Sequence, residues 1–167
     1  MKPLFTDSSR ASQIKTKGAC DYVTQVDIQV QKLIKEGLYQ MYPQVQFMGE
    51  EQDNTAIDRK GDFWILDPVD GTTNLIHDFR HSTLSLAYAE AGTVELGIVY
   101  QPYTDEMFVA VKGKGAFLNG KPIHVSEAKT LSESLVTIGT SPYYHELADW
   151  ILRYLKKLFY LVRISAI

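Results

Sequence analysis

The apolar positions of this chain follow the period of a helix in one stretch and of strands in the next. After Thr24, apolar residues recur every three or four positions as far as Met41, which is typical of an amphipathic helix. Thr24 and Asp27 have the spacing of a capping box, and the pair Tyr42-Pro43 favours an end to the helix. The spacing therefore predicts a helix that begins with a cap at Thr24.

Short apolar runs separated by turn residues predict strands in much of the remaining chain. The run Phe63–Leu66 is continuously apolar, which is typical of a strand buried on both faces, and it is expected to end at Asp67-Pro68. Further strands are expected over 45–48, 82–89, 94–100, 107–111, 117–118 and 122–125. Connections this short predict antiparallel neighbours, because parallel strands need long crossovers.

The two ends of the chain give a weaker pattern than its middle. The first twenty residues are polar and turn-like, whereas 142–157 predicts a helix and 158–167 is rich in β-branched and aromatic residues. The Asn119-Gly120 pair between two apolar runs predicts a hairpin. The expected fold class is therefore α+β, with a mainly antiparallel sheet flanked by helices.

Composition narrows the class of protein. The 167 residues are 45% apolar with a net charge of −3, which suits a globular domain, or one domain and a piece of another, and not a disordered chain. The single cysteine, Cys20, excludes a disulfide framework. Without an apolar leader or a long apolar run, we expect neither secretion nor a membrane partner, and a cytoplasmic location is the default prediction.

Acidic residues gather in one short window. Positions 50–70 hold two bases against these acids: Glu50, Glu51, Asp53, Asp58, Asp62, Asp67 and Asp70. A nucleic-acid-binding protein would show the opposite bias, a clustered basic face, so no nucleic-acid partner is expected. Composition alone would make such a run a solvated surface, and only the positions of these acids argue for chemistry.

The segment Trp64–Asn74, with the sequence WILDPVDGTTN, carries most of the chemical information. A buried strand would deliver Asp67 at its C-terminal end, and Pro68 fixes the backbone so that Val69 presents its carbonyl in the same turn. Asp70 follows at once. Two carboxylates and a carbonyl form a hard-oxygen site that suits Mg²⁺.

The neighbouring residues extend this candidate site. The amides of Gly71 and Thr72 begin a short helix or turn, which is a natural place for a phosphate oxygen. Two carboxylates ~4 Å apart repel by ~4 kcal/mol at an effective dielectric of ~20, so a cluster that also included Glu50 and Glu51 would need protons or cations. The alternative stays open that the two aspartates cap a turn and the two glutamates face water.

Three motifs in order resemble the magnesium-dependent, lithium-sensitive inositol monophosphatase family. They are DYVTQVD at 21–27, GEE at 49–51 and WILDPVDGTTN at 64–74, and KGAFLNG at 114–120 is similar to the family's hairpin. The resemblance runs from about Ile14 to the last residues. It implies the N-terminal part of a layered α/β/α/β/α sugar-phosphatase fold.

The resemblance implies metal-binding roles for four matching positions. Glu50, Asp67 and the Val69 carbonyl would hold a first Mg²⁺, and Asp67 and Asp70 would hold a second. Glu51 would position water next to the metal and not bind it directly. The implied cofactor is therefore Mg²⁺.

The resemblance also implies the catalytic positions. Asp27 and Thr72 would form a hydrogen-bonded pair that orients the attacking water, with Glu50 as a further catalytic residue. The amides of Gly71 and Thr72 would bind phosphate, and Lys17 would lie on a loop that approaches the site.

The implied function is Mg²⁺-dependent hydrolysis of inositol monophosphate, or of a related small sugar or nucleotide phosphate, by a homodimer. Residues 1–140 would form the N-terminal metal-binding phosphatase domain. Residues 141–167 would form a helix and strand leading into a second domain, whose Trp-Asp motif this chain does not contain. The alternative is a truncated, non-catalytic remnant that folds and binds Mg²⁺ weakly.

Overall fold

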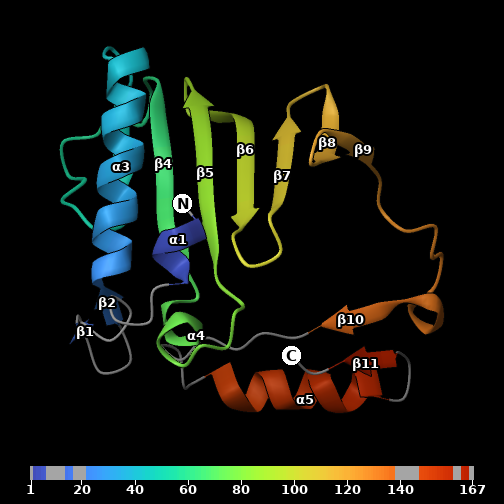
Figure 1. Cartoon of the computed structure of the whole chain (residues 1–167). Coiled ribbons are helices and arrows are strands. Elements are labelled where there is room, and N and C mark those ends of the chain that lie inside the picture. Colours follow the sequence, from blue (N-terminus) through green and yellow to red (C-terminus); the bar gives the residue numbers. More distant parts are fainter. Residues whose placement is uncertain (1, 7–13, 17–21, 138–146, 160–162, 166–167) are drawn as a thin grey trace. The chain divides into compact units, whose positions relative to one another are not determined.

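A computed structural model describes residues 2–6, 14–16, 22–137, 147–159 and 163–165 (Figure 1). The chain divides into two compact units, Met1–His124 and Val125–Ile167. The first unit contains, in chain order, α1 Lys2–Phe5, β1 Ile14–Thr16, β2 Tyr22–Thr24, α3 Gln25–Met41, β3 Gln46–Gly49, β4 Phe63–Asp70, α4 Thr72–Ile76, β5 Thr83–Glu90, β6 Thr93–Gln101, β7 Glu106–Val111, β8 Gly115–Leu118 and β9 Lys121–Ile123. The division at residue 140 made from the sequence stays a prediction.

A seven-stranded sheet in sequence order β3 to β9 forms the body of the first unit. Every neighbouring pair is antiparallel except β3 and β4, which run parallel. The predicted mainly antiparallel α+β architecture is thus confirmed, and the Asn119-Gly120 turn joins β8 to β9 as expected. β1 and β2 form a separate antiparallel pair in a region whose sequence pattern is weak.

Helix α3 begins where the sequence predicts and buries most of the predicted apolar row, but two polar residues are buried beside that row. Its cap is Thr24, and Val26 and Val30 are fully buried against the sheet. Leu33, which fits the apolar period, is 52% exposed, whereas the polar Asp27 and Gln31 are buried. The buried stripe also includes the i, i+4 row that contains these two polar residues, because each of them accepts a hydrogen bond from a group outside the helix.

Strand β4 is longer than expected. Phe63, Trp64 and Leu66 are buried, as predicted, and Ile65 is half-buried. The predicted end at Asp67-Pro68 is wrong, because β4 continues to Asp70. The register against β5 shifts between Asp67 and Asp70, and this irregularity accommodates a proline that has no N–H to donate to the ladder.

One apolar core joins the elements that carry the candidate site. Its buried members come from α1, α3, β4, α4 and β5: Phe5, Val26, Val30, Leu66, Val69, Leu75 and Leu84. The core thereby fixes the N-terminal end of α3 against the C-terminal end of β4 and the start of α4. Figure 1 shows α3 and α4 beside these strands.

The second unit is smaller and contains η1 Leu131–Glu133, β10 Leu135–Thr137, α5 Ala148–Phe159 and β11 Arg163–Ser165. β10 and β11 pair in parallel, with α5 between them along the chain. The predicted C-terminal helix and strand are thus present, although residues 142–146 of the expected helix lie outside the described residues. Among the described helices, none has the length and apolar character that crossing a membrane requires.

We predict that Thr24→Val destabilises the first unit by about 1–2 kcal/mol. The Thr24 hydroxyl accepts from the Val26 N–H at 3.1 Å and donates to Asp27 Oδ2 at 2.6 Å, and valine keeps the shape without either bond. Chemical denaturation would measure the loss. Thr24→Ser keeps the hydroxyl and should retain most of the stability, and equal losses in both variants would contradict a capping role.

Candidate metal-binding active site

The parallel pairing of β3 and β4 brings two acidic residues together. Glu50 follows the last residue of β3, and its N–H donates to the Leu66 carbonyl at 3.1 Å. Asp67 is the next residue on β4, and the Asp67 and Glu50 side chains lie within hydrogen-bonding reach of each other. Residues 17 positions apart in sequence thus become side-chain neighbours.

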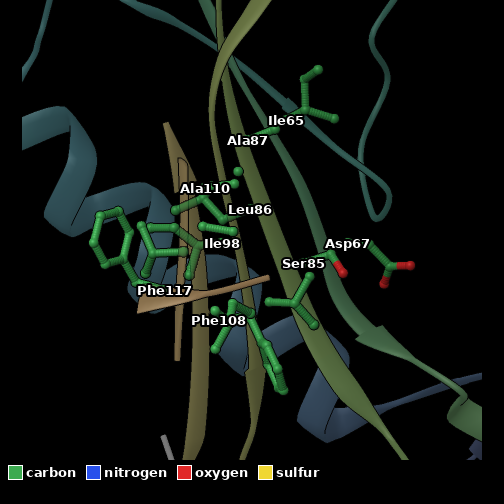
Figure 2. Close-up of a pocket in the computed structure, with 14 residues that line it drawn as sticks. Ile65, Asp67, Ser85, Leu86, Ala87, Ile98, Phe108, Ala110 and Phe117 are labelled. Atoms are coloured by element: carbon green, nitrogen blue, oxygen red, sulfur yellow. The ribbon is translucent and has the colours of Figure 1, made fainter. Parts of the chain in front are cut away.

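Asp67 lies at one side of an apolar hollow of about 380 Å³ on the sheet, with Phe117 of β8 at the other side (Figure 2). Burial raises the pKa of Asp67 to about 7, and the charges of Glu50 and Asp70 act in the same direction. The Val69 N–H donates to Asp67 Oδ1 at 3.1 Å and opposes the rise. Excess negative charge in a partly buried position is what a divalent cation neutralises.

The donor set suits a hard cation such as Mg²⁺, because it consists of carboxylate oxygens with a backbone carbonyl nearby. Within the described part of the chain, however, no three acidic, histidine or cysteine side chains converge closely enough to hold an ion as they stand. Glu50 and Asp67 are in contact, and Asp70 acts on Asp67 through its charge. These residues thus suit a metal ion in two respects, the oxygen atoms that they offer as ligands and the negative charge that they bring together.

Asp27 is the buried carboxylate of the site and is only 1% exposed. Its Oδ2 accepts from the Thr24 N–H at 2.7 Å and from the Thr24 hydroxyl at 2.6 Å, which completes the capping box of α3. Its Oδ1 accepts from the Thr72 hydroxyl at 3.1 Å, across 45 positions of sequence. One carboxylate thus caps a helix and orients a residue of α4.

Thr72 connects the two halves of the site. Its hydroxyl also lies 3.1 Å from the Val69 carbonyl, so its single proton is shared between Asp27 and that carbonyl. The Val69 N–H in turn contacts Asp67. A continuous path of hydrogen bonds therefore runs from the cap of α3 to the carboxylates between β3 and β4.

The turn that follows β4 requires a glycine. Gly71 has a φ of +89°, a left-handed conformation, and a Cβ there would lie 3.0 Å from the His81 carbonyl oxygen. The Ser82 hydroxyl donates to the Gly71 carbonyl at 2.8 Å, and the Asn74 amide donates to the His81 carbonyl at 2.8 Å. These bonds hold in place the segment whose backbone amides are predicted to bind phosphate.

The structure brings together most of the residues that the sequence singled out. Asp27, Thr72 and Val69 share hydrogen bonds, and Glu50 with Asp70 surrounds Asp67 with negative charge. The metal, phosphate and catalytic roles of these residues stay predictions. Lys17 lies outside the described residues.

Sequence reasoning missed two amide side chains. The Gln31 side-chain oxygen accepts from the Glu51 N–H at 2.9 Å, and Asn54 bonds both the N–H and the carbonyl of Gly49. The sequence did contain an indication for Gln31, because it stands four residues after Asp27 in the predicted helix and so lies on the same face. It contained none for Asn54, because this residue stands in a polar loop without periodicity.

Fold and site together define a sheet protein with a carboxylate-rich oxygen site at the end of a buried strand. A sequence model of the inositol monophosphatase family matches residues 2–165. The chain belongs to the inositol monophosphatase family. The sequence resemblance is thus confirmed.

Individual relatives agree with this assignment. Inositol-1-monophosphatase of Rhizobium meliloti (strain 1021) is 38% identical over 128 residues, which cover 77% of this chain and 48% of that protein. The crystal structure of the extragenic suppressor protein suhB from Bartonella henselae matches with a TM-score of 0.89 at 30% identity, over 98% of this chain and 64% of that one. The expected sugar-phosphatase fold is confirmed.

A third comparison is a crystal structure of an IMPase/NADP phosphatase complexed with Mg²⁺ and phosphate. It matches with a TM-score of 0.77 at 27% identity, over 92% of this chain and 57% of that one. The present chain spans about half the length of the curated relatives that it matches.

We predict that metal-free protein loses stability as the pH rises from about 4 to 7, and that Asp67→Asn removes part of this loss. The pKa of Asp67 is raised from 3.8 to about 7, so between these values the folded chain holds a proton that the unfolded chain releases. Stability from this group is therefore complete below pH 4 and declines through pH 7.

The measurement is urea denaturation in EDTA at several pH values. The difference in unfolding free energy between wild type and the asparagine variant reports the titration of Asp67 together with that of its contact Glu50. A difference that stays constant from pH 4 to 7 would contradict the raised pKa.

Proposed function

We propose that this protein is a Mg²⁺-dependent phosphomonoesterase that hydrolyses inositol monophosphate or a related small phosphorylated metabolite. The observation that carries the proposal is the hydrogen-bond path from Asp27 through Thr72 and Val69 to Asp67. It links a buried carboxylate and a hydroxyl to an acidic, all-oxygen cluster. Family membership supports phosphatase chemistry, and the solved IMPase/NADP phosphatase complex with Mg²⁺ and phosphate supports the choice of cofactor.

In this proposal Glu50, Asp67, Asp70 and the Val69 carbonyl would hold Mg²⁺. When bound, Mg²⁺ neutralises phosphate oxygens and lowers the pKa of a water molecule toward neutrality. Charge supports the assignment, because the carboxylate neighbours of Asp67 disfavour its ionised form without a cation. Glu51 would assist from beside the metal.

The Asp27–Thr72 pair would orient the attacking water. Asp27 is buried and accepts three hydrogen bonds, which hold its carboxylate in place. When the Thr72 proton is directed to Asp27, the Thr72 oxygen is free to accept a hydrogen bond from water. The water oxygen would then form a bond to phosphorus as the bond between phosphorus and the ester oxygen breaks. The attacking water gives up one proton and the departing alkoxide takes up one, so that the products are the alcohol and inorganic phosphate.

The amides of Gly71 and Thr72 would hold the phosphate, and Lys17 would approach it from its loop. The left-handed conformation of Gly71 and the anchoring of its carbonyl by Ser82 support a fixed binding segment. We further propose a cytoplasmic homodimer without a nucleic-acid or membrane partner. The family resemblance supports the homodimer, and the lack of a clustered basic stretch in the sequence argues against a nucleic-acid partner.

We predict that the 167-residue chain releases inorganic phosphate from inositol 1-phosphate only with Mg²⁺, and that Asp67→Asn reduces this release by at least about a hundredfold. The loss of a direct ligand should exceed the roughly 10–100-fold effect typical of indirect metal partners. A phosphate-release assay with and without EDTA would measure both effects.

Release that survives Asp67→Asn would contradict the site assignment. A folded wild-type chain that is stabilised by Mg²⁺ but releases no phosphate would contradict the catalytic proposal. That outcome would instead favour the alternative of a non-catalytic chain that binds metal.

We predict that Thr72→Val lowers kcat by about a hundredfold or more, because valine keeps the β-branched shape but cannot orient water. Thr72→Ser keeps the hydroxyl and should retain most of the activity. KM for inositol 1-phosphate should change little in either variant. Equal kcat values for the serine and valine variants would refute the role of the hydroxyl.

A further inference from the structure

The backbone around Glu50 is fixed at three consecutive N–H groups, whose acceptors lie in a loop, in strand β4 and in helix α3. The Gly49 N–H donates to Asn54 Oδ1 at 3.2 Å, and the Glu50 N–H donates to the Leu66 carbonyl at 3.1 Å. The Glu51 N–H donates to Gln31 Oε1 at 2.9 Å. The only one of these three acceptors that comes from a helix is the side chain of Gln31.

Gln31 is built into the interior of the first unit. It is 7% exposed and lies on the buried row of α3, one turn after Asp27. Burial of an amide without partners is costly, and the bond from Glu51 offsets part of that cost. The same helix thus holds Asp27 on one side of the site and the Glu50 segment on the other.

Gly49 leaves the space that Gln31 occupies. A Cβ at position 49 would lie 2.4 Å from Gln31 Oε1 and 2.7 Å from its Cδ, which is closer than real side chains approach. Gly49 has no left-handed φ that would by itself require glycine. The close approach of the buried amide, together with the Phe47 ring at 2.9 Å, therefore disfavours any larger residue at this position.

A second amide holds the other side of the segment. Asn54 Nδ2 donates to the Gly49 carbonyl at 2.7 Å, and Asn54 Oδ1 also accepts from Gln52 Nε2 at 3.1 Å. Gln52 in turn accepts from the Lys35 ammonium of α3 at 2.7 Å. The Glu50 segment is therefore connected to helix α3 in two ways, directly through Gln31 and indirectly through Asn54 and Gln52.

We propose that Gln31 is a positioning residue that sets the direction of the Glu50 carboxylate toward Asp67 by holding the Glu51 amide. The inference rests on the proposed function, because it assigns Gln31 a role in the affinity of the site for Mg²⁺. Without this acceptor, the segment after β3 keeps its strand pairing to Leu66 and its bonds to Asn54 but loses its direct hydrogen bond to α3. The Glu50 carboxylate is then held less firmly in its direction toward Asp67.

The test is Gln31→Met, which keeps the length of the side chain and removes its acceptor. Thermal unfolding of the full 167-residue chain is followed during a titration with Mg²⁺, beside the Mg²⁺ dependence of phosphate release. We expect the Mg²⁺ midpoint to rise about tenfold or more in both measurements. Gln40→Met is the matched control, since Gln40 is an exposed residue of the same helix and its midpoint should equal that of wild type.

Two more variants separate positioning from packing. Gln31→Glu keeps an oxygen acceptor at the same reach and should retain a midpoint no higher than that of wild type. Gly49→Ala places a methyl group against the Gln31 amide and also 2.9 Å from Cε1 of Phe47, and it should raise the midpoint without altering residue 31. It also keeps the proposal testable if Gln31→Met does not fold.

The outcomes distinguish this inference from the proposed function. If wild type responds to Mg²⁺ and Gln31→Met only unfolds at a lower temperature, with an unchanged midpoint, then Gln31 is merely structural and the inference is wrong. If wild type itself shows no response to Mg²⁺, the metal site and this inference fail together.

Discussion

The fold and the candidate site both depend on the buried carboxylate of Asp27. A buried charge is tolerated only when hydrogen bonds replace the water that it loses, and Asp27 obtains them from Thr24 and Thr72. The bonds from Thr24 start helix α3, and the bond from Thr72 ties that helix to the turn after β4. A single desolvated group thus couples local helix formation to the geometry of the site.

A second constraint is the mutual repulsion of the acids that this geometry gathers. Apolar packing of Leu66 and Val69 in the core fixes the backbone of β4 on both sides of Asp67, and this backbone places the Asp67 side chain beside Glu50. The favourable burial of these apolar side chains therefore offsets the repulsion between the carboxylates of the candidate site. Functional sites typically contain such an unfavourable arrangement of charges, and the stability of the rest of the fold compensates for it.

Much of the fold and the site could be predicted from local patterns. The capping box at Thr24, the hairpin at Asn119-Gly120 and the antiparallel strands depend on neighbouring residues, and each is confirmed. The end of β4 was predicted wrongly, because a proline usually terminates pairing and only the ladder with β5 provides room for the irregularity at Pro68. The contact between Thr72 and Asp27 came from the family resemblance and not from periodicity.

The sequence by itself determined which residue types are available to the site, the order of the elements and the start of α3, because these follow from chemistry within a few positions. Only the tertiary structure decided that α3 buries Gln31 while it leaves Leu33 exposed, and that Asn54 and Gln31 both hold the segment of Glu50. The physical reason is that a buried polar side chain needs a hydrogen-bond partner, and for Gln31 this partner is a backbone N–H that is distant in sequence. Such partners are set by the packing of α3 on the sheet, which no local pattern encodes.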